Sequence, residues 1–309
     1  MSTIPHAKVI VNPAAGGYSV RKEWPRIRKR LHSIGFSFDY EYSEGTGHAA
    51  EIAKAAVHSG YRYLVAVGGD GTINEVANGI LCSNTSAHTI LGIISAGTAC
   101  SFVRSVGIPQ DYIHACSLLT SQGRKSVDVG VAECKSGGQP LRRFFVNEAD
   151  VGFGAEVVEA SKDIPRHLGR SINYAPFVIA SVRCLFSYQN KRLSICADKD
   201  DATSSLCTMV VIANGSYFGG GMHIAPQAKP DDGLLDMIVV GDTEKSELVK
   251  IWLMSYEGTH VTHNSIKVKR IKEVTIESQE KALVETDGEL IGECPVSFRI
   301  MPSALTIVV

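Results

Sequence analysis

The chain has 309 residues, enough for two domains at the usual size of about 150 residues each. Hydrophobic residues make up 44% of the chain and charged residues 20%, which excludes a disordered protein. The 31 basic and 32 acidic residues give a net charge of -1, so no overall field attracts nucleic acid or an anionic membrane. Any such attraction has to be local.

Residues 1–126 alternate short β-rich runs with helical patterns. Strands are expected at 7–13, 36–42, 61–71 and 90–95, and helices at 18–33, 48–58 and 72–81. This alternation is typical of a mostly parallel sheet covered by helices. We therefore predict an α/β domain over residues 1–126.

Near Lys125 the pattern changes to strands separated by turn residues. Strands are expected at 126–134, 142–153, 191–198, 207–216, 233–242, 265–271, 273–278, 281–293 and 296–301. Two helical patterns, at 168–187 and 244–256, interrupt them. We predict a β-rich second domain over residues 127–309, with the tail at about 300–309 packing back on the first domain.

The strongest local signal is a buried strand that ends in Gly68-Gly69-Asp70-Gly71 and runs directly into an amphipathic helix. Glycines let the backbone approach a ligand closely, and the first turn of a helix presents free N–H groups that favour a phosphate. The alternative is a tight turn in which Thr72 and Glu75 form a capping box. The local pattern leaves both interpretations open.

Similar glycine and threonine corners follow other expected strands, at Val11–Gly17 and Ile94–Thr98, and Thr46–His48 opens a helix. In an open parallel sheet the carboxyl ends of the strands lie along one edge, so we expect these loops to meet in one crevice. Such convergence favours a nucleotide site. The chain has no G-x-x-x-x-G-K-[ST] sequence, which excludes a P-loop. The segment around Ser95 is not a G-x-S-x-G nucleophile elbow either, because Ile93 occupies the position of the first glycine.

Two Asp-Gly pairs, Asp232-Gly233 and Asp287-Gly288, lie between β-like runs, where such pairs are first of all hairpin turns. A phosphoryl transfer to an alcohol also needs carboxylates, for metal ions and to accept the hydroxyl proton. The candidates are Asp70, Asp232, Asp287 and Glu289.

Six cations within Arg21–Arg30 form either a solvated helix face or a patch for a membrane surface.

Taken in order, these loops resemble the diacylglycerol kinase catalytic-domain family, in particular its soluble bacterial branch, which is also similar to sphingosine kinases and more distantly to NAD kinases. In the first domain the resemblance rests on Asn12–Gly17, Thr46–His48, Gly68–Glu75, Gly92–Thr98 and Phe102–Arg104. In the second it rests on Asn147, Gly152–Gly154, Ala213-Asn214, Gly219–Gly221, Ala225-Pro226, Asp232-Gly233 and Asp287–Glu289. The ordered set covers nearly the whole chain.

The resemblance implies an ATP-dependent kinase that phosphorylates the hydroxyl of a lipid such as diacylglycerol. It implies an ATP site between an N-terminal α/β domain and a C-terminal β-sandwich domain. The residues that would hold the nucleotide are Asn12, Thr46, Gly69, Asp70, Gly71, Thr72, Ile73, Asn74, Glu75 and Thr98. Asp287 would be the general base with Glu289 beside it, and Mg²⁺ would be held at Lys229, Asp232 and Leu234.

The chain departs from the family pattern in one loop. Where the family reads Gly-Thr-Gly-Asn-Asp-Phe-Ala-Arg, Cys100 and Ser101 replace the Asn and Asp, and Ser95 replaces a usual Pro. Serine carries no fixed charge, so a second metal contact and the affinity for nucleotide are both affected.

Two other functions stay open at this point. The first is a nucleotide-binding regulatory protein whose turnover is impaired by Ser101, and the second is a kinase of a soluble metabolite such as NAD.

We expect a lipid at a membrane surface, and no nucleic acid, as the partner. With no C-x-x-C pair among its eight cysteines and no signal-peptide pattern, the chain is expected in the cytoplasm, peripheral to the membrane. A homodimer is compatible with the sequence.

Overall fold

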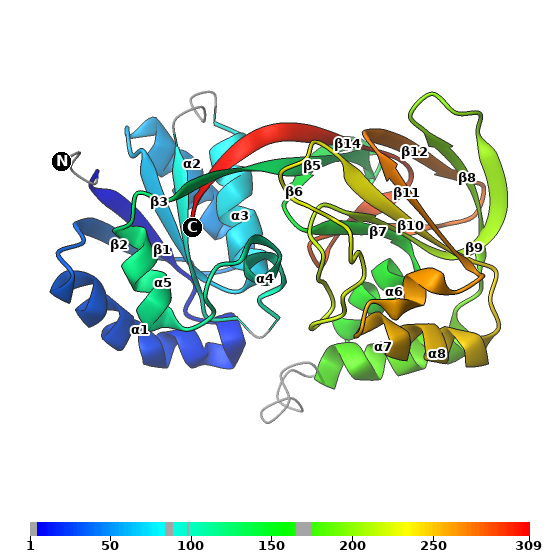
Figure 1. The fold of residues 1–309 in the computed structure, drawn as a ribbon, viewed down its shortest axis with the longest axis horizontal. Coiled ribbons are helices and arrows are strands. Elements are labelled where there is room, and N and C mark those ends of the chain that lie inside the picture. Colours follow the sequence, from blue (N-terminus) through cyan, green and yellow to red (C-terminus); the bar gives the residue numbers. More distant parts are fainter. Residues whose placement is uncertain (1–4, 84–88, 98, 165–174) are drawn as a thin grey trace. The chain divides into compact units, whose positions relative to one another are not determined.

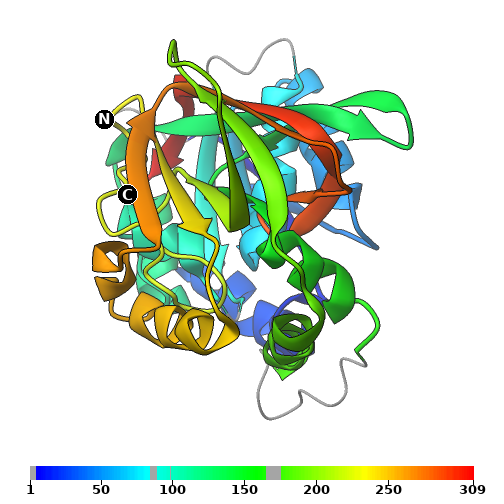
Figure 2. The same cartoon turned by 90° about the vertical axis from the view of Figure 1, so that its right-hand side faces the viewer.

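The computed structural model describes residues 5–83, 89–97, 99–164 and 175–309. The chain divides into two compact units, unit 1 with residues 1–128 and 303–309 and unit 2 with residues 129–302. The ribbon is drawn from two directions in Figure 1 and Figure 2. Among the helices of the described residues, none is both long and apolar enough to cross a bilayer.

Unit 1 contains a parallel sheet in the strand order β2-β1-β3-β4-β14. The strands are β1 (Ala7–Val11), β2 (Phe38–Tyr42), β3 (Tyr63–Gly68), β4 (Ile90–Ser95) and the end of β14 (Glu289–Val308). All six residues of β3 are buried, as expected for a central strand with both faces covered. At the edge, Thr306 and Ile307 pair with Ile90 and Leu91. The predicted α/β fold is confirmed.

The helices of unit 1 cover both faces of this sheet. They are α1 (Ala15–Ser33), α2 (His48–His58), α3 (Asp70–Leu81), α4 (Ser101–Val106) and α5 (Tyr112–Leu119). Trp24, Ile27 and Leu31 of α1 join α5 in one cluster with the side chains of β1 and β3. Figure 1 shows α2 and α3 on the opposite side of the sheet from α1 and α5. This arrangement leaves the carboxyl ends of the strands to the connecting loops.

Unit 2 is built from antiparallel strands that close on themselves. Its strands are most of β5 (Arg124–Ser136), then β6 (Gln139–Phe145), β7 (Glu148–Gly152), β8 (Lys191–Ala197), β9 (Thr203–Ala213), β10 (Leu235–Gly241), β11 (Ile266–Ile271), β12 (Glu273–Ser278), β13 (Leu283–Thr286) and most of β14. Hydrogen bonds run around the circuit β9-β7-β13-β14-β12-β8 and back to β9. β10 and β11 extend the sheet from β9. The predicted β-rich domain is confirmed.

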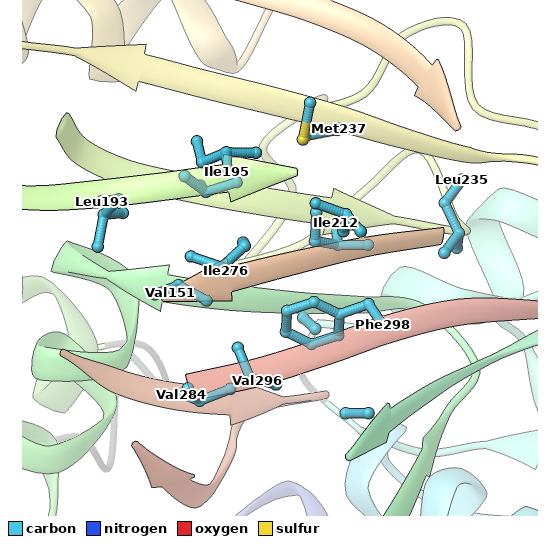
Figure 3. Packing of buried hydrophobic residues seen from close by; sticks show 14 of the residues in the cluster. Val151, Leu193, Ile195, Ile212, Leu235, Met237, Ile276, Val284, Val296 and Phe298 are labelled. Carbon is cyan, nitrogen blue, oxygen red and sulfur yellow. The ribbon is translucent and has the colours of Figure 1, made fainter. Parts of the chain in front are cut away.

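The closed strands enclose a hydrophobic core. Phe145 and Phe298 meet edge to face in it, with ring centroids 6.1 Å apart. Figure 3 shows Val151, Val284 and Val296 pointing toward the same interior from β7, β13 and β14. Because side chains alternate along a strand, the neighbours of Val151 on β7, Glu148 and Asp150, lie on the other face.

In the part of unit 2 that the structure describes, three α-helices and one 3₁₀ helix accompany these strands. They are α6 (Phe153–Ser161), α7 (Ala175–Ser187), α8 (Lys245–Ser255) and η3 (Thr259–Thr262). The helix expected at 168–187 is present from Ala175, and residues 168–174 lie outside the described residues. The prediction of a single strand at 142–153 was wrong. That segment holds the end of β6, all of β7 and the start of α6, because the backbone N–H groups of Val146 and Asn147 bond to a carboxylate instead of a neighbouring strand.

Candidate active site

The loops at the carboxyl edge of the unit 1 sheet contact one another directly. Asn12, which follows β1, donates from Nδ2 to Oγ1 of Thr72 in the first turn of α3, at 3.0 Å. The same Asn12 accepts the N–H of Ala14 on its other side-chain atom, at 3.0 Å. Asn12 therefore ties the first glycine corner to the Gly-Gly-Asp-Gly corner.

A second junction joins the corners after β3 and β4. A Cβ atom added to Gly97 would lie 2.4 Å from the Cα of Gly69, and one added to Gly69 would lie 3.3 Å from the Cα of Gly97. Any side chain at 97 would therefore push two backbones apart. This close approach requires glycine at position 97, and glycine at position 69 relieves a second, less severe contact.

Asp70 links the start of α3 to the start of α4. Its carboxylate accepts the N–H groups of Phe102 and Ser101, each at 3.1 Å. Burial raises the pKa of Asp70, while these backbone hydrogen bonds act in the opposite direction. The carboxylate of Asp70 is thus bonded to the start of the short helix α4. These bonds reduce the repulsion between Asp70 and an anion bound at the start of α3.

The capping-box interpretation of Thr72 and Glu75 was wrong. Helix α3 begins at Asp70, so Thr72 already lies within the first turn, and it accepts from Asn12. Glu75 caps a different helix: its carboxylate accepts the N–H groups of Gly47 at 2.9 Å and Ala49 at 3.0 Å, at the start of α2. The polar residues of this helix serve to assemble the sheet edge.

The other residues expected to hold a nucleotide have unequal access to solvent. Gly71 is exposed, and a Cβ there would meet nothing within 4 Å. Thr46 is exposed at the start of α2, whereas Ile73 and Asn74 are buried. Thr98 lies outside the described residues. From α3, the open surface is therefore the backbone of its first turn.

The residues that depart from the family pattern contact each other. Ser95 donates to the Cys100 sulfur at 2.9 Å, and that thiol donates to the carbonyl of Gly97 at 3.2 Å. Cys100 has φ of 51°, in the left-handed region that a side chain rarely adopts. Ser95 and Cys100 thus form a small network of their own under the loop, and burial raises the pKa of the Cys100 thiol.

In unit 2, Asp287 and Gly288 form the two-residue turn between β13 and β14. Both have positive φ, 47° and 83°, as the tight turns of hairpins require. The carboxylate of Asp287 accepts three backbone N–H groups, from Val146 at 2.8 Å and from Asn147 and Glu148 at 3.0 Å. The hairpin interpretation therefore holds, and the same Asp287 fixes the neighbouring loop.

That loop is held from its other side by two asparagines of the ordered set. Asn147 donates from its side chain to the carbonyl of Tyr217 at 2.7 Å. Asn214 donates from its side chain to the carbonyl of Val146 at 2.8 Å, and its N–H bonds to the carbonyl of Asn147 at 2.9 Å. In both positions the side-chain amide of asparagine acts as a donor to a backbone carbonyl.

Glu289 begins β14 and forms an ion pair with Arg143 of β6. The side chains of both partners keep about a quarter of their surface exposed, 29% for Glu289 and 25% for Arg143. Glu289 therefore remains accessible from solvent, in contrast to its neighbour Glu285, which is 2% exposed.

Sequence reasoning missed a group of buried carboxyls next to this turn, formed by Glu148, Asp150 and Glu285. All three are at most 5% exposed. Burial raises the pKa of Glu285 to about 8 and that of Asp150 to about 7. Their signal was the alternation of acidic with apolar residues on two strands that were expected to be buried, Glu148-Ala-Asp150-Val on β7 and Val-Glu285 on β13.

The loop expected to hold Mg²⁺ is closed by an ion pair within the chain. Asp232 pairs with Arg270 of β11, and its carboxylate also accepts the N–H of Leu234 at 3.2 Å. Lys229 is exposed. The oxygens are of the kind that Mg²⁺ prefers, but the guanidinium already neutralises the carboxylate at this position. The described residues hold no group of three or more His, Cys, Asp or Glu side chains that could bind a metal ion.

Two protein families match the chain. Residues 6–132 match the diacylglycerol kinase catalytic domain, and residues 148–309 match the YegS C-terminal NAD kinase beta sandwich-like domain. Among curated proteins, a Bacillus subtilis diacylglycerol kinase is 26% identical over 94% of this chain and 92% of its own length. A Staphylococcus aureus diacylglycerol kinase is 27% identical over 94% of this chain and 88% of its own length.

Solved structures show the same fold. The crystal structure of a diacylglycerol kinase from Bacillus anthracis has a TM-score of 0.73 at 22% identity and covers 100% of this chain and 98% of its own. Yeast NADH kinase complexed with NADH has a TM-score of 0.58 at 12% identity, over 99% of this chain and 83% of its own. The protein belongs to the family of the YegS C-terminal NAD kinase beta sandwich-like domain, whose model covers more than half of the chain, and with a diacylglycerol kinase catalytic domain matched at residues 6–132 it is a lipid kinase.

Proposed function

We propose that this kinase transfers the γ-phosphoryl group of ATP to the free hydroxyl of a diacylglycerol-like lipid. The observation that carries the proposal is the turn Asp287–Glu289, which presents two carboxylates on a backbone fixed by three N–H bonds. A kinase of NAD would share the glycine corners, but the curated relatives named above are lipid kinases.

For the nucleotide, the glycine corners of unit 1 offer backbone donors instead of charged side chains. The exposed first turn at Gly71 is open to a phosphate, and the turn's own carboxylate, Asp70, bonds to Ser101 and Phe102. We assign Asn12, Thr46 and Gly69 to the same nucleotide site. Backbone N–H groups at a helix start favour phosphate through both hydrogen bonds and the helix dipole.

In the transfer, the lipid oxygen forms a bond to the γ-phosphorus while the bond from that phosphorus to the bridging oxygen of ADP breaks. A carboxylate of the turn accepts the hydroxyl proton. Three backbone donors already bond to the oxygens of Asp287, whereas Glu289 has one partner, Arg143, and is partly exposed. The geometry therefore favours Asp287 as the residue that fixes the turn and Glu289 as the freer proton acceptor within this pair.

Mg²⁺ is proposed to arrive with the nucleotide, since phosphoryl transfer requires neutralisation of the phosphate charge. For a second ion at Lys229, Asp232 and Leu234, the competitor is the guanidinium of Arg270. Replacement of Arg270 by Met tests this competition. If the loop can hold Mg²⁺, the ion should raise the melting temperature of Arg270→Met more than that of the unaltered protein. An equal rise in both proteins would show that the loop does not bind a second ion.

The acceptor lipid requires contact with a membrane surface, and two surfaces support it. On α7, five apolar side chains, Phe177, Val178, Ile179, Val182 and Phe186, are between 40% and 71% exposed. Leu253 on α8 is 65% exposed, and Tyr256, directly after that helix, is 47% exposed. The helices are neighbours, because Lys245 at the start of α8 bonds to the carbonyl of Phe186. Exposed apolar side chains grouped in this way are characteristic of contact sites.

Vesicle co-sedimentation separates these surfaces from the basic helix α1. Replacement of Phe186 by Ser should weaken binding to anionic vesicles, while Ile113→Ser, a control at a 49% exposed position on α5, should not. Reversal of the exposed charges between Arg21 and Lys29 should weaken binding mainly at low salt. If neither change alters sedimentation, these membrane surfaces are wrong.

The activity test uses the full chain with γ-labelled ATP, Mg²⁺ and diacylglycerol in mixed micelles, with the product identified by mass spectrometry. Glu289→Gln should lower kcat by about 100-fold or more without a change in melting temperature, as expected for loss of a general base. Glu293→Gln, an exposed residue on the same strand, is the control. Absence of labelled lipid, together with calorimetric binding of ATP, would instead favour a nucleotide-binding protein with impaired turnover. In that case Ser101→Asp should raise the rate of lipid phosphorylation.

A further inference from the structure

Three buried carboxyls lie behind the Asp287–Glu289 turn and have no part in the proposed function so far. In the antiparallel pair of β7 and β13, Glu285 stands opposite Asp150, and the N–H of Asp287 bonds to the carbonyl of Glu148 at 2.9 Å. Side chains of Glu148, Asp150 and Glu285 therefore share one face of the strand pair. The opposite face, with Ala149, packs into the core.

No cation in the described residues is paired with these three carboxyls. Arg143 of β6 is already paired with Glu289. The other titratable groups next to the cluster are Asp287 at the turn and Tyr188 after α7, which lies near both Asp150 and Glu156 of α6. The charged pair Glu159 and Lys162 of α6 is exposed. The next strand, β9, contributes apolar side chains on this side, including Val211. Several negative charges cannot coexist in such surroundings, so protons must remain bound.

Glu148 and Glu285 occupy diagonal positions on this buried face of the strand pair, where two long side chains come within reach of each other. Burial, with the neighbouring Glu285, raises the pKa of Glu148 well above its ordinary value. Two carboxyls in contact titrate as a unit, and the proton between them turns a repulsion into a bond. Asp150 is held separately, by the N–H of Ala155 at 2.9 Å.

The pair contacts the turn on both sides. Glu285 accepts the N–H of Gly288 at 2.7 Å, inside the turn itself. The backbone of Glu148 donates to the Asp287 carboxylate at 3.0 Å and accepts from the Asp287 N–H at 2.9 Å. If the two glutamates moved apart, both ends of the turn would move with them.

We propose that Glu148 and Glu285 are positioning residues, whose shared proton holds the Asp287–Glu289 turn in the geometry that the transfer reaction needs. The proposal rests on the proposed function, because it assigns the turn to proton acceptance. Its consequence is an upper pH limit for the enzyme. When the pair loses its proton, two adjacent carboxylates repel each other and the turn opens.

The kinetic test compares two substitutions of Glu148. An amide at this position donates to Glu285 as the protonated carboxyl does, but it has no proton to lose near neutral pH. Glu148→Ala should lower kcat by about tenfold with little change in KM for ATP, since positioning errors act on the chemical step. Glu148→Gln should recover most of that loss, and the decline of kcat above pH 8 should move upward by at least about one pH unit. Glu293→Gln should retain the original pH profile.

An unchanged alkaline limb in Glu148→Gln would overturn the proposal. So would an unaltered kcat in a folded Glu148→Ala. If Glu148→Ala does not fold, the profile of Glu148→Gln decides, because glutamine preserves both size and hydrogen bond.

A readout without lipid separates this proposal from the proposed function. Infrared spectra at neutral pH should contain the carbonyl band of a protonated carboxyl, and that band should weaken in the double variant Glu148→Gln/Glu285→Gln. If the band weakens in the double variant but the protein has no lipid kinase activity, the proposed function is rejected and the shared proton of Glu148 and Glu285 is retained. Absence of the band would reject the pair whatever the activity.

Discussion

Unit 1 and unit 2 assemble their candidate functional residues by opposite means. In unit 1, glycines remove side chains so that loops from different strands touch, as Gly69 and Gly97 do. In unit 2, acidic side chains in and beside a turn accept backbone N–H groups, as the half-buried Asp287 and the buried Glu285 do. The first arrangement depends on the space available and the second on the charge state. The two regions should therefore fail under different perturbations.

The largest effect is expected when Asp287 is replaced by Ala, because three backbone N–H groups lose their acceptor. At about 1 kcal/mol or more for each unsatisfied donor, the free energy of unfolding should fall by about 3 kcal/mol. Urea unfolding followed by circular dichroism measures this loss. Asp201→Ala, at an exposed position between β8 and β9, is the control, and equal losses in both variants would show that Asp287 has no special role.

Next in size is the response of unit 1 to an added methyl group. Gly97→Ala should cost about 1–3 kcal/mol, because its Cβ would lie 2.4 Å from the backbone of Gly69. Separation of the two corners should also weaken ATP binding by about tenfold. Gly45→Ala, where a Cβ meets nothing within 4 Å, is the matched control. Calorimetry that gives the same ATP affinity for Gly97→Ala and the unaltered protein would contradict the contact.

A smaller effect is expected on the pH dependence of stability, which should change in a variant of unit 2 but not in one of unit 1. The pKa of Asp150, raised by burial to about 7, lies above its ordinary value of 3.8. Between these two values the folded state binds a proton that the unfolded state does not. This contribution to stability is therefore full below pH 3.8 and is lost as pH rises toward 7. Asp150→Asn, which keeps the acceptor for Ala155 without the charge, should show a flatter dependence of melting temperature between pH 5 and 8, with a gain of about 1–2 kcal/mol at the upper end.

Gly97→Ala should leave that pH dependence unaltered, because Gly97 belongs to unit 1. The comparison between the units would lose its basis if both variants changed the slope equally.

The smallest effect concerns the residues that depart from the family pattern. Ser95 and Cys100 bond to each other at 2.9 Å, so a double-mutant cycle of Ser95→Ala and Cys100→Ala should give a coupling of about 0.5–1.5 kcal/mol. Additive losses would mean that the two substitutions from the family sequence arose without physical dependence on each other.

The same contrast explains what the sequence could reveal. Strand and helix patterns predicted the order of elements in unit 1, and Gly-rich corners after strands marked the residues that the structure brings together, such as Asn12 and Thr72. The short helix α5 escaped notice, since its clearest signal was a single capping residue. Asp111 accepts the N–H groups of Ile113 and His114 there.

Unit 2 was harder because its important contacts cross between strands. Nothing near Glu148 in the chain indicates that it shares a buried face with Glu285. That residue lies more than a hundred positions later and is brought there by the pairing of β7 with β13. For the same reason Glu75 looked like part of a local capping box, although its partners are on α2. A local pattern identifies a residue's chemistry, whereas its partner depends on strand register.

The strand β14 has a consequence for how the protein is made. Its final residues pair with β4, and Val308 is 2% exposed within the unit 1 core, although all of unit 2 precedes them in the chain. On the ribosome, the sheet of unit 1 would therefore remain incomplete, with the edge of β4 uncovered, until synthesis has passed through the whole of unit 2. An open strand edge invites pairing with other chains, so a chaperone that shields β4 during translation would act on the most vulnerable stage of this protein's folding.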